Sequence, residues 1–165
     1  MGAVKNITRG ILFTLVYMAI TIIIPLTTFT IFKEIPVLGI TIRLSEAKYN
    51  EIIYWIVAFG LLISGCAFFN YSSPKQSIRK GIFALLQIIL NCMYLWSYKF
   101  SGATDIEYLF ADGTVIMIVG TLVLTYMGIY FLMVIIKGYD LIDFIVNRDK
   151  IRQIRIEKAR GDKKE

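Results

Sequence analysis

Two side-chain amides stand out as the groups that could bind a ligand inside this mostly apolar chain. Gln87 and Asn91 lie near the middle of an uncharged stretch of 18 residues, Gly81–Tyr98. Helical spacing places residues four apart on one face, and Tyr94 follows one turn further along that face. Amides at mid-membrane depth are costly when they face lipid, so we expect these to face other helices. We therefore interpret this stretch as the floor of any site in the protein.

Neutral polar residues from the other apolar stretches complete the candidate site. A ligand for such a set would be neutral or lipid-like, because no charged side chain lies inside these stretches. The same residues could instead hold helices together through hydrogen bonds worth about 0.6 to 2 kcal/mol each, and we favour that interpretation. The candidate ligand-binding residues are Gln87, Asn91, Tyr94, Tyr17, Thr21, Thr121 and Thr125, with Thr14 and Ser64 in the wider polar set.

Recognisable catalytic or metal-binding patterns are missing from the sequence. The chain has no histidine, which removes His-ligated haem, most zinc and copper sites, and His-based acid–base pairs. Cys66 and Cys92 lie in separate apolar stretches without a CxxC spacing, so we interpret both as buried structural thiols of unknown separation. We expect no catalytic residue, no metal and no cofactor, and hence a protein that is not an enzyme.

The composition is that of a membrane protein rather than of a soluble globule. Hydrophobic residues make up 57% of the 165 residues and charged residues 18%, whereas soluble domains carry about 45–50% apolar and about 25% charged residues. The apolar residues gather in four runs, each long enough to cross a bilayer as a helix. We predict an all-α membrane protein, a four-helix bundle in one domain (1–136) with spans at about 10–32, 52–69, 81–98 and 114–136.

Small and polar residues within the spans indicate how the helices pack. Pro25 should kink the first span, and Thr27 or Thr28 should help to satisfy the backbone groups that the proline frees. In the second span Gly60 and Ser64 are four apart, a spacing that permits close helix approach. A polar face is predicted along the first span at Thr14, Tyr17, Thr21 and Thr28.

The two loops on the outer side carry short alternating patterns. Gly39–Leu44 and Ile106–Phe110 each alternate apolar and polar residues, which is typical of strands. We therefore predict a small sheet that pairs the two loops outside the membrane. Asp112 is predicted to cap the start of the fourth span.

Lysine and arginine residues are unevenly divided between the two sides of the predicted spans. With the N-terminus in the cytoplasm, inner segments hold 14 of them and outer loops hold four, Lys33, Arg43, Lys48 and Lys99. Because basic flanks and short loops stay on the cytoplasmic side, we predict a cell-membrane protein with both termini in the cytoplasm.

Residues 137–165 form a basic tail after the fourth span, and we predict a partly amphipathic juxtamembrane helix there that lies on anionic lipid. The residues assigned to lipid or partner contact are Arg148, Lys150, Arg152, Arg155, Lys158 and Arg160. Asp140 and Asp143 could bind a cation or a lipid amine, but we favour the interpretation that they are solvated or pair with Lys137 and the nearby basic tail. Because no aromatic residue is interleaved with the basic residues from Arg148 onward, we expect no nucleic-acid binding.

Two functions remain open at this point. The leading one is a non-enzymatic accessory or scaffold subunit that engages membrane lipids and either a membrane-protein partner or further copies of itself. The alternative is a small carrier, channel or binding protein for a neutral or lipid-like ligand, built around Gln87 and Asn91. In the first case the polar residues only pack helices, and in the second they bind the ligand.

Overall fold

The computed structural model describes residues 2–34, 41–43, 45–74, 77–101, 103, 105–110, 113–118, 120–147 and 153. The first helical rod is continuous and consists of α1 (Gly2–Met18), the π-helix η1 (Ala19–Ile23) and α2 (Ile24–Glu34). The remaining helices are α3 (Glu46–Ser72), α4 (Ile78–Phe100) and α5 (Gly120–Val146). The strands are β1 (Thr41–Arg43), β2 (Asp105–Phe110) and β3 (Gly113–Ile118).

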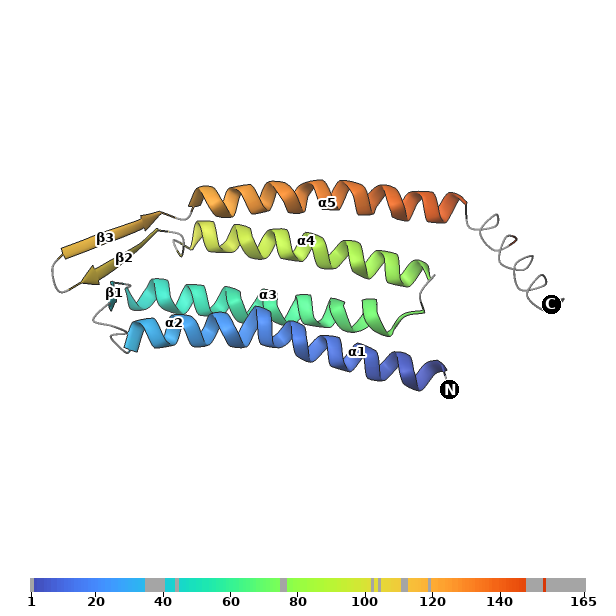
Figure 1. Cartoon of the computed structure of the whole chain (residues 1–165), viewed down its shortest axis with the longest axis horizontal. Coiled ribbons are helices and arrows are strands. Elements are labelled where there is room, and N and C mark those ends of the chain that lie inside the picture. Colours follow the sequence, from blue (N-terminus) through green and yellow to red (C-terminus); the bar gives the residue numbers. More distant parts are fainter. Residues whose placement is uncertain are drawn as a thin grey trace, which may run out of the picture.

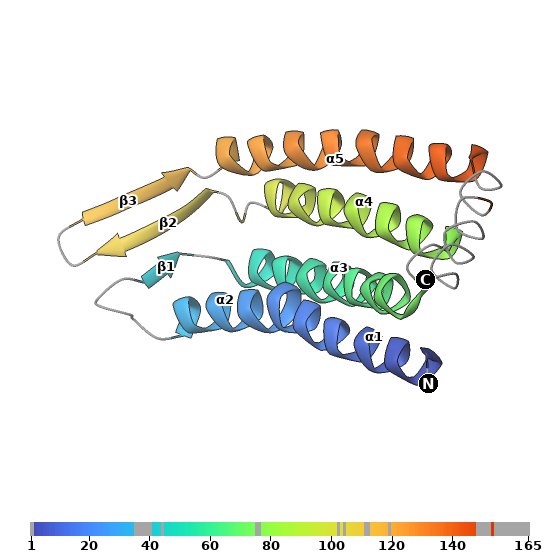
Figure 2. The same cartoon turned by 45° about the vertical axis from the view of Figure 1, so that its right-hand side comes forward.

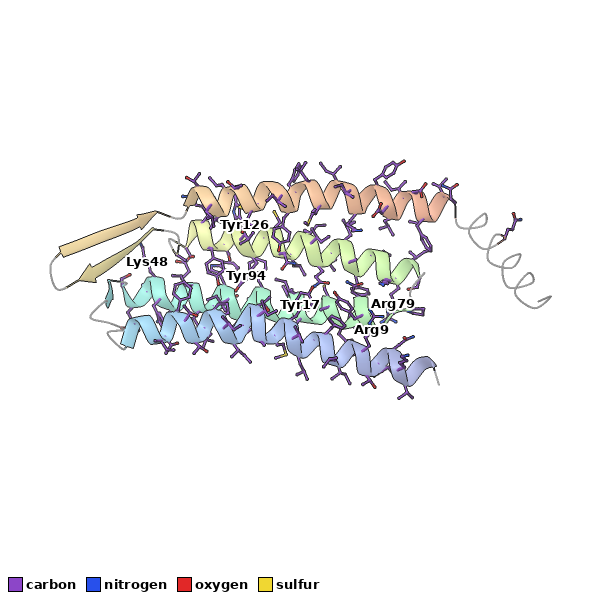
Figure 3. All side chains as sticks on the ribbon, in the orientation of Figure 1. Arg9, Tyr17, Lys48, Arg79, Tyr94 and Tyr126 are labelled. Atoms are coloured by element: carbon purple, nitrogen blue, oxygen red, sulfur yellow. The ribbon has the colours of Figure 1, made fainter. Side chains whose placement is uncertain are left out.

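The helical rods lie side by side in a row (Figures 1 and 2). α1 packs against α3, α3 against α4, and α4 against α5, so the extensive contacts follow chain order. Consecutive rods run in opposite directions, and the strands lie together at one end, which we call the sheet end. The opposite end, the basic end, is where α1 and α4 begin; Figure 3 shows Arg9 and Arg79 near it and Lys48 near the sheet end.

Among the described residues, three rods are long and apolar enough to cross a membrane, over Val4–Ile31, Glu46–Ser72 and Ile78–Phe100. They contain the first three predicted spans. The predicted start of the fourth span is wrong, because Gly113–Ile118 is a strand and the helix runs instead from Gly120 to Val146. A short apolar run rich in β-branched residues suits a buried helix and a strand equally well, which explains the error.

The strands form one antiparallel sheet in the order β1-β2-β3. β1 pairs with β2 through Thr41 opposite Leu109 and Arg43 opposite Glu107, so the two segments are paired as the alternation predicts. β2 pairs with β3 along its whole length, from Asp105 opposite Ile118 onward. The predicted cap at residue 112 lies outside the described residues.

The first rod contains a π-helical turn directly before Pro25. Proline has no amide hydrogen and its ring crowds the preceding turn, so the local backbone opens from α to π geometry. The wider turn inserts an extra residue and rotates the face that follows it. The prediction that Thr28 shares a face with Thr14 and Thr21 is therefore wrong: Thr21 is buried, whereas Thr28 is exposed.

The apolar core is built around α3, which packs between the first rod and α4. Ile52, Ile56 and Ile63 are at most 1% exposed, and they recur at helical spacing with Phe59 and Cys66. α5 differs sharply, because Gly120 is its only buried residue in the described part of the chain. Many of its large apolar side chains are therefore exposed in the described structure.

Candidate functional site

Tyr94 links α4 to the distorted turn of the first rod. Pro25 cannot donate to the carbonyl oxygen of Thr21, four residues before it. The Tyr94 hydroxyl donates to that oxygen at 2.8 Å and lies 2.9 Å from the Tyr98 hydroxyl. Because both Tyr94 and Thr21 are buried, this contact supplies a donor to a backbone carbonyl that has lost the amide donor of a regular α-helix.

The two central amides have different surroundings. Gln87 is buried, and its Oε1 accepts a hydrogen bond at 3.1 Å from Nδ2 of Asn70 on α3. The Oδ1 of Asn70 is buried with no hydrogen-bond partner among the described residues. Asn91 is only partly buried, and no hydrogen bond joins its side chain to another part of the described chain. Of the two predicted amides, Gln87 thus forms a hydrogen bond between α3 and α4, whereas Asn91 is partly buried and forms no such bond in the described chain.

Most hydroxyl groups of the predicted polar set bond within their own helices. Thr14 donates to the carbonyl of Gly10 at 2.8 Å, and Thr21 donates to that of Tyr17 at 2.7 Å. Ser64 donates to Gly60 in the same way, at 2.7 Å. Each of these hydroxyls donates its hydrogen bond within its own helix, so none of them donates to a neighbouring helix.

The structure separates the predicted site into two parts. Tyr17, Thr21, Gln87 and Tyr94 lie among the first rod, α3 and α4, and the Tyr17 ring packs at 6.2 Å from that of Tyr71. Thr121 and Thr125 are exposed on α5 and line a different cavity of about 550 Å³ with Leu122, Tyr126 and Ile129.

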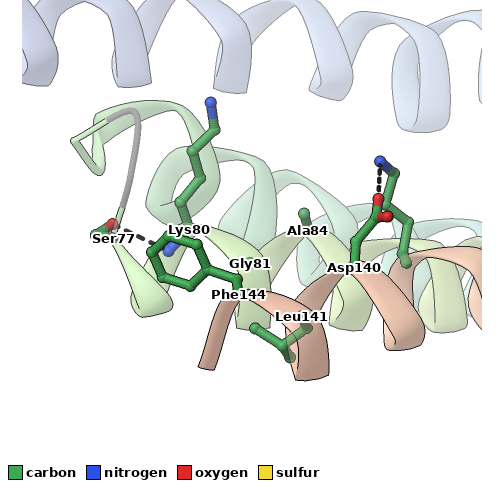
Figure 4. A pocket seen from close by; sticks show the side chains of 8 residues that line it. Ser77, Lys80, Gly81, Ala84, Asp140, Leu141 and Phe144 are labelled. Atoms are coloured by element: carbon green, nitrogen blue, oxygen red, sulfur yellow. Dashed lines mark hydrogen bonds and ion pairs between the residues drawn. The ribbon is translucent and has the colours of Figure 1, made fainter. Parts of the chain in front are cut away.

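A further cavity that sequence reasoning missed lies between α4 and α5 at the basic end (Figure 4). It encloses about 250 Å³. Its floor is apolar, and its polar rim consists of one serine, two lysines and one aspartate. The lining residues are Ser77, Lys80, Gly81, Ala84, Lys137, Asp140, Leu141 and Phe144. The sequence signal was a glycine directly after a lysine at the start of a helix, which permits a close approach beside a charge.

Most polar groups at the rim of this α4–α5 cavity have a partner within the protein. Lys137 pairs with Asp140 at 2.9 Å, the partner that we favoured for this carboxylate, while Asp143 accepts from Asn147 at 2.7 Å. Ser77 caps α4 by accepting from the backbone amide of Lys80 at 3.2 Å. Lys80 is therefore the cation on this rim without an ion pair to another described residue.

Gly81 explains why the two helices approach each other at this cavity. A Cβ atom at this position would lie 2.7 Å from the Leu141 Cδ1 atom, so a larger residue would require the Leu141 side chain to move. The result is an apolar cleft with an ammonium group at its mouth. This combination would suit an amphiphile with an anionic head, whose chain would lie in the cleft and whose head would lie beside the lysine.

The basic tail residues and the two cysteines were also predicted from the sequence. The six basic tail residues, from Arg148 to Arg160, lie outside the described part of the chain. Cys66 is buried and Cys92 partly buried, and both are free thiols. Comparisons with protein families, with curated proteins and with solved structures found no match.

Proposed function

We propose that the chain is a four-span integral membrane protein with both termini in the cytoplasm. Its three long apolar rods support membrane insertion, and α5 adds a stretch, Gly120–Ile136, that contains no charged residue. The 14 to 4 division of lysine and arginine supports the orientation, with the basic end facing the cytoplasm. The sheet would then lie on the outer side.

Within the membrane, the protein acts as a non-enzymatic accessory or scaffold subunit that binds a second membrane protein along α5. The observation that supports this proposal is whether a neighbouring residue fills the space beside each glycine. Those at the helix contacts are all filled by a neighbour: Gly10 meets Ser72, Gly60 meets Ile22 and Gly81 meets Leu141. On α5, by contrast, Gly128 and Gly138 have open space where a side chain would project.

Membrane helices associate through small residues because these let backbones approach closely. Thr121, Thr125 and Gly128 follow one another at steps of four and three along α5, and the two threonines border the cavity of about 550 Å³. This face carries small residues, as the glycine contacts between the other helices do, but no helix packs against it in the described structure. A second helix would bury it.

Cysteine cross-linking in native membranes tests this function. In a background with Cys66 and Cys92 replaced by alanine, Gly128→Cys should form one cross-linked product with a partner protein or a second copy. Gly65→Cys is the matched control, because Gly65 is equally open but lies on α3, which already has helices on both sides. Absence of a product with Gly128→Cys, or equal products with both variants, would contradict the docking role of α5.

The α4–α5 cavity supports an engagement of lipid by the same subunit. An anionic phospholipid seated there would place its head near Lys80 and its chain against Leu141 and Phe144. Such a lipid would sit between α4 and the helix that we assign to partner binding. The lipid would then stabilise the position of α5.

A further inference from the structure

Another groove lies between α3 and α4 near the sheet end, whereas the α4–α5 cavity lies at the opposite, basic end. It encloses about 370 Å³. Aromatic and thioether side chains form its walls. Those of α3 are Trp55 and Phe59, and those of α4 are Met93, Trp96 and Phe100. Glu51, one helical turn before Trp55, is the only charged side chain among its described lining residues.

The aromatic rings of this groove are held in place by their own neighbours. Trp55 stacks on Phe59 with ring centres 5.6 Å apart, and Trp96 packs on Phe100 with ring centres 4.6 Å apart. Phe59 is buried, whereas Trp96 is 53% exposed. The groove therefore presents two supported ring pairs, one from each helix, with accessible surface on both sides.

Among the polar side chains that line the groove, the Glu51 carboxylate is the group available to bind a ligand. Ser97 and Ser101 also line it, but their hydroxyls donate to the carbonyls of Tyr94 and Tyr98 on their own helix. Lys99 extends away, toward Gly120 of α5. Lys48 lies one turn before Glu51 and is the nearest lysine along α3.

We propose that this groove binds an organic ammonium ion, a compact cation with an apolar surface such as a quaternary ammonium group. Aromatic faces carry partial negative charge and attract such cations, and several rings around one space form the arrangement that recognises them. The Glu51 carboxylate adds a full negative charge at one side of the rings. An anionic ligand would be repelled by it, and a metal ion would find too few oxygen ligands.

Tryptophan fluorescence gives a direct measurement, because Trp55 and Trp96 are the two tryptophans of the chain and both line the groove. The full-length protein would be reconstituted in nanodiscs of phosphatidylglycerol and titrated with choline. A saturable change in emission is expected. The neutral isostere 3,3-dimethylbutan-1-ol should bind at least about fivefold more weakly, since it keeps the shape and lacks the charge.

Variants separate the carboxylate from general effects of charge. Glu51→Gln should weaken choline binding at least about fivefold and leave the response to the neutral isostere unchanged. Glu46→Gln is the matched control, because Glu46 lies on the same helix but pairs with Lys33 outside the groove. It should leave both responses unchanged. A Trp96→Phe variant retains an aromatic ring and should retain choline binding, now reported by Trp55 alone.

A second set of nanodiscs, made of phosphatidylcholine, identifies the source of the cation. If lipid headgroups occupy the groove, the emission will already be shifted and added choline will have no further effect. If soluble cations are the ligands, choline will titrate equally in both lipids. The proposal is overturned if choline gives no saturable change in phosphatidylglycerol, if the neutral isostere binds equally well, or if Glu51→Gln and Glu46→Gln behave alike.

Discussion

The hydroxyl of Tyr94 donates to the carbonyl oxygen of Thr21 at 2.8 Å, where Pro25 has removed the donor that a regular helix would supply. One side chain from α4 thus completes the backbone of a different rod. The proline, the π-turn and the tyrosine form one structural unit, although 69 residues separate Pro25 from Tyr94 in the sequence.

Tyr94→Phe should lower the free energy of unfolding by about 1–3 kcal/mol, because it leaves a buried carbonyl without a donor. Tyr98→Phe removes only the contact between the two hydroxyls and should have a smaller effect. In a Pro25→Ala background an amide hydrogen is available again, so the added effect of Tyr94→Phe should shrink. Thermal or denaturant unfolding in detergent provides the measurement, and equal losses in both backgrounds would break the proposed link.

Gly60→Ala should destabilise the protein by about 1–3 kcal/mol, because its new methyl group would overlap the Ile22 side chain at the contact between α3 and the π-turn. Gly65→Ala is the control on the same helix, since nothing lies within 4 Å of the added carbon. That change should be neutral or stabilising by up to about 1 kcal/mol. Melting temperatures of the two variants measured side by side distinguish the sites, and indistinguishable values would contradict the packing.

Gln87→Leu should cost about 1–3 kcal/mol, because it leaves the buried amide of Asn70 without its partner. Asn91→Leu should change stability by less than about 0.5 kcal/mol, since it breaks no hydrogen bond in the described structure. Thermal shifts of both variants, with and without lipid extract, also address the ligand hypothesis. A lipid-dependent shift that Asn91→Leu abolishes would favour a binding site over simple helix packing.

Lys80→Gln should reduce retention of an anionic phospholipid about fivefold, as expected for losing about 1 kcal/mol of attraction at this surface. Lys5→Gln is the control, because Lys5 lies at the same end on α1 and lines no part of the α4–α5 cavity. Native mass spectrometry of gently extracted protein would count the bound lipids. Equal losses in both variants would indicate diffuse attraction instead of a defined cavity.

Local patterns predicted much of the fold. The uncharged runs located α3 and α4, and the alternation at Gly39–Leu44 located β1. Both signals depend on neighbours within a few residues, so one sequence suffices to read them. The start of α5 was missed because Thr114–Ile118 fits either structure, and only pairing with β2 selects the strand.

The candidate site was harder to predict, because it depends on the order of helices in space. Helical spacing correctly placed Gln87 and Tyr94 on one buried face, but it could not show that Thr121 and Thr125 face away from them. The position of Lys80 at the rim of a cavity could not be predicted either, because it follows from the approach of α5 at Gly81. Contacts between distant segments carry this information, and composition does not.

The three-stranded sheet has a mechanical consequence for the whole molecule. β1 leaves the first rod and enters α3, β2 follows α4, and β3 leads into α5, so backbone pairing ties all four rods together at one end. Because the sheet joins the rods at this end, a rotation of α5 about the sheet end would displace its residues in proportion to their distance from the sheet. The displacement would be greatest at the basic end. The mouth beside Lys80 is thus the part of the protein whose width responds most to a small rotation of α5.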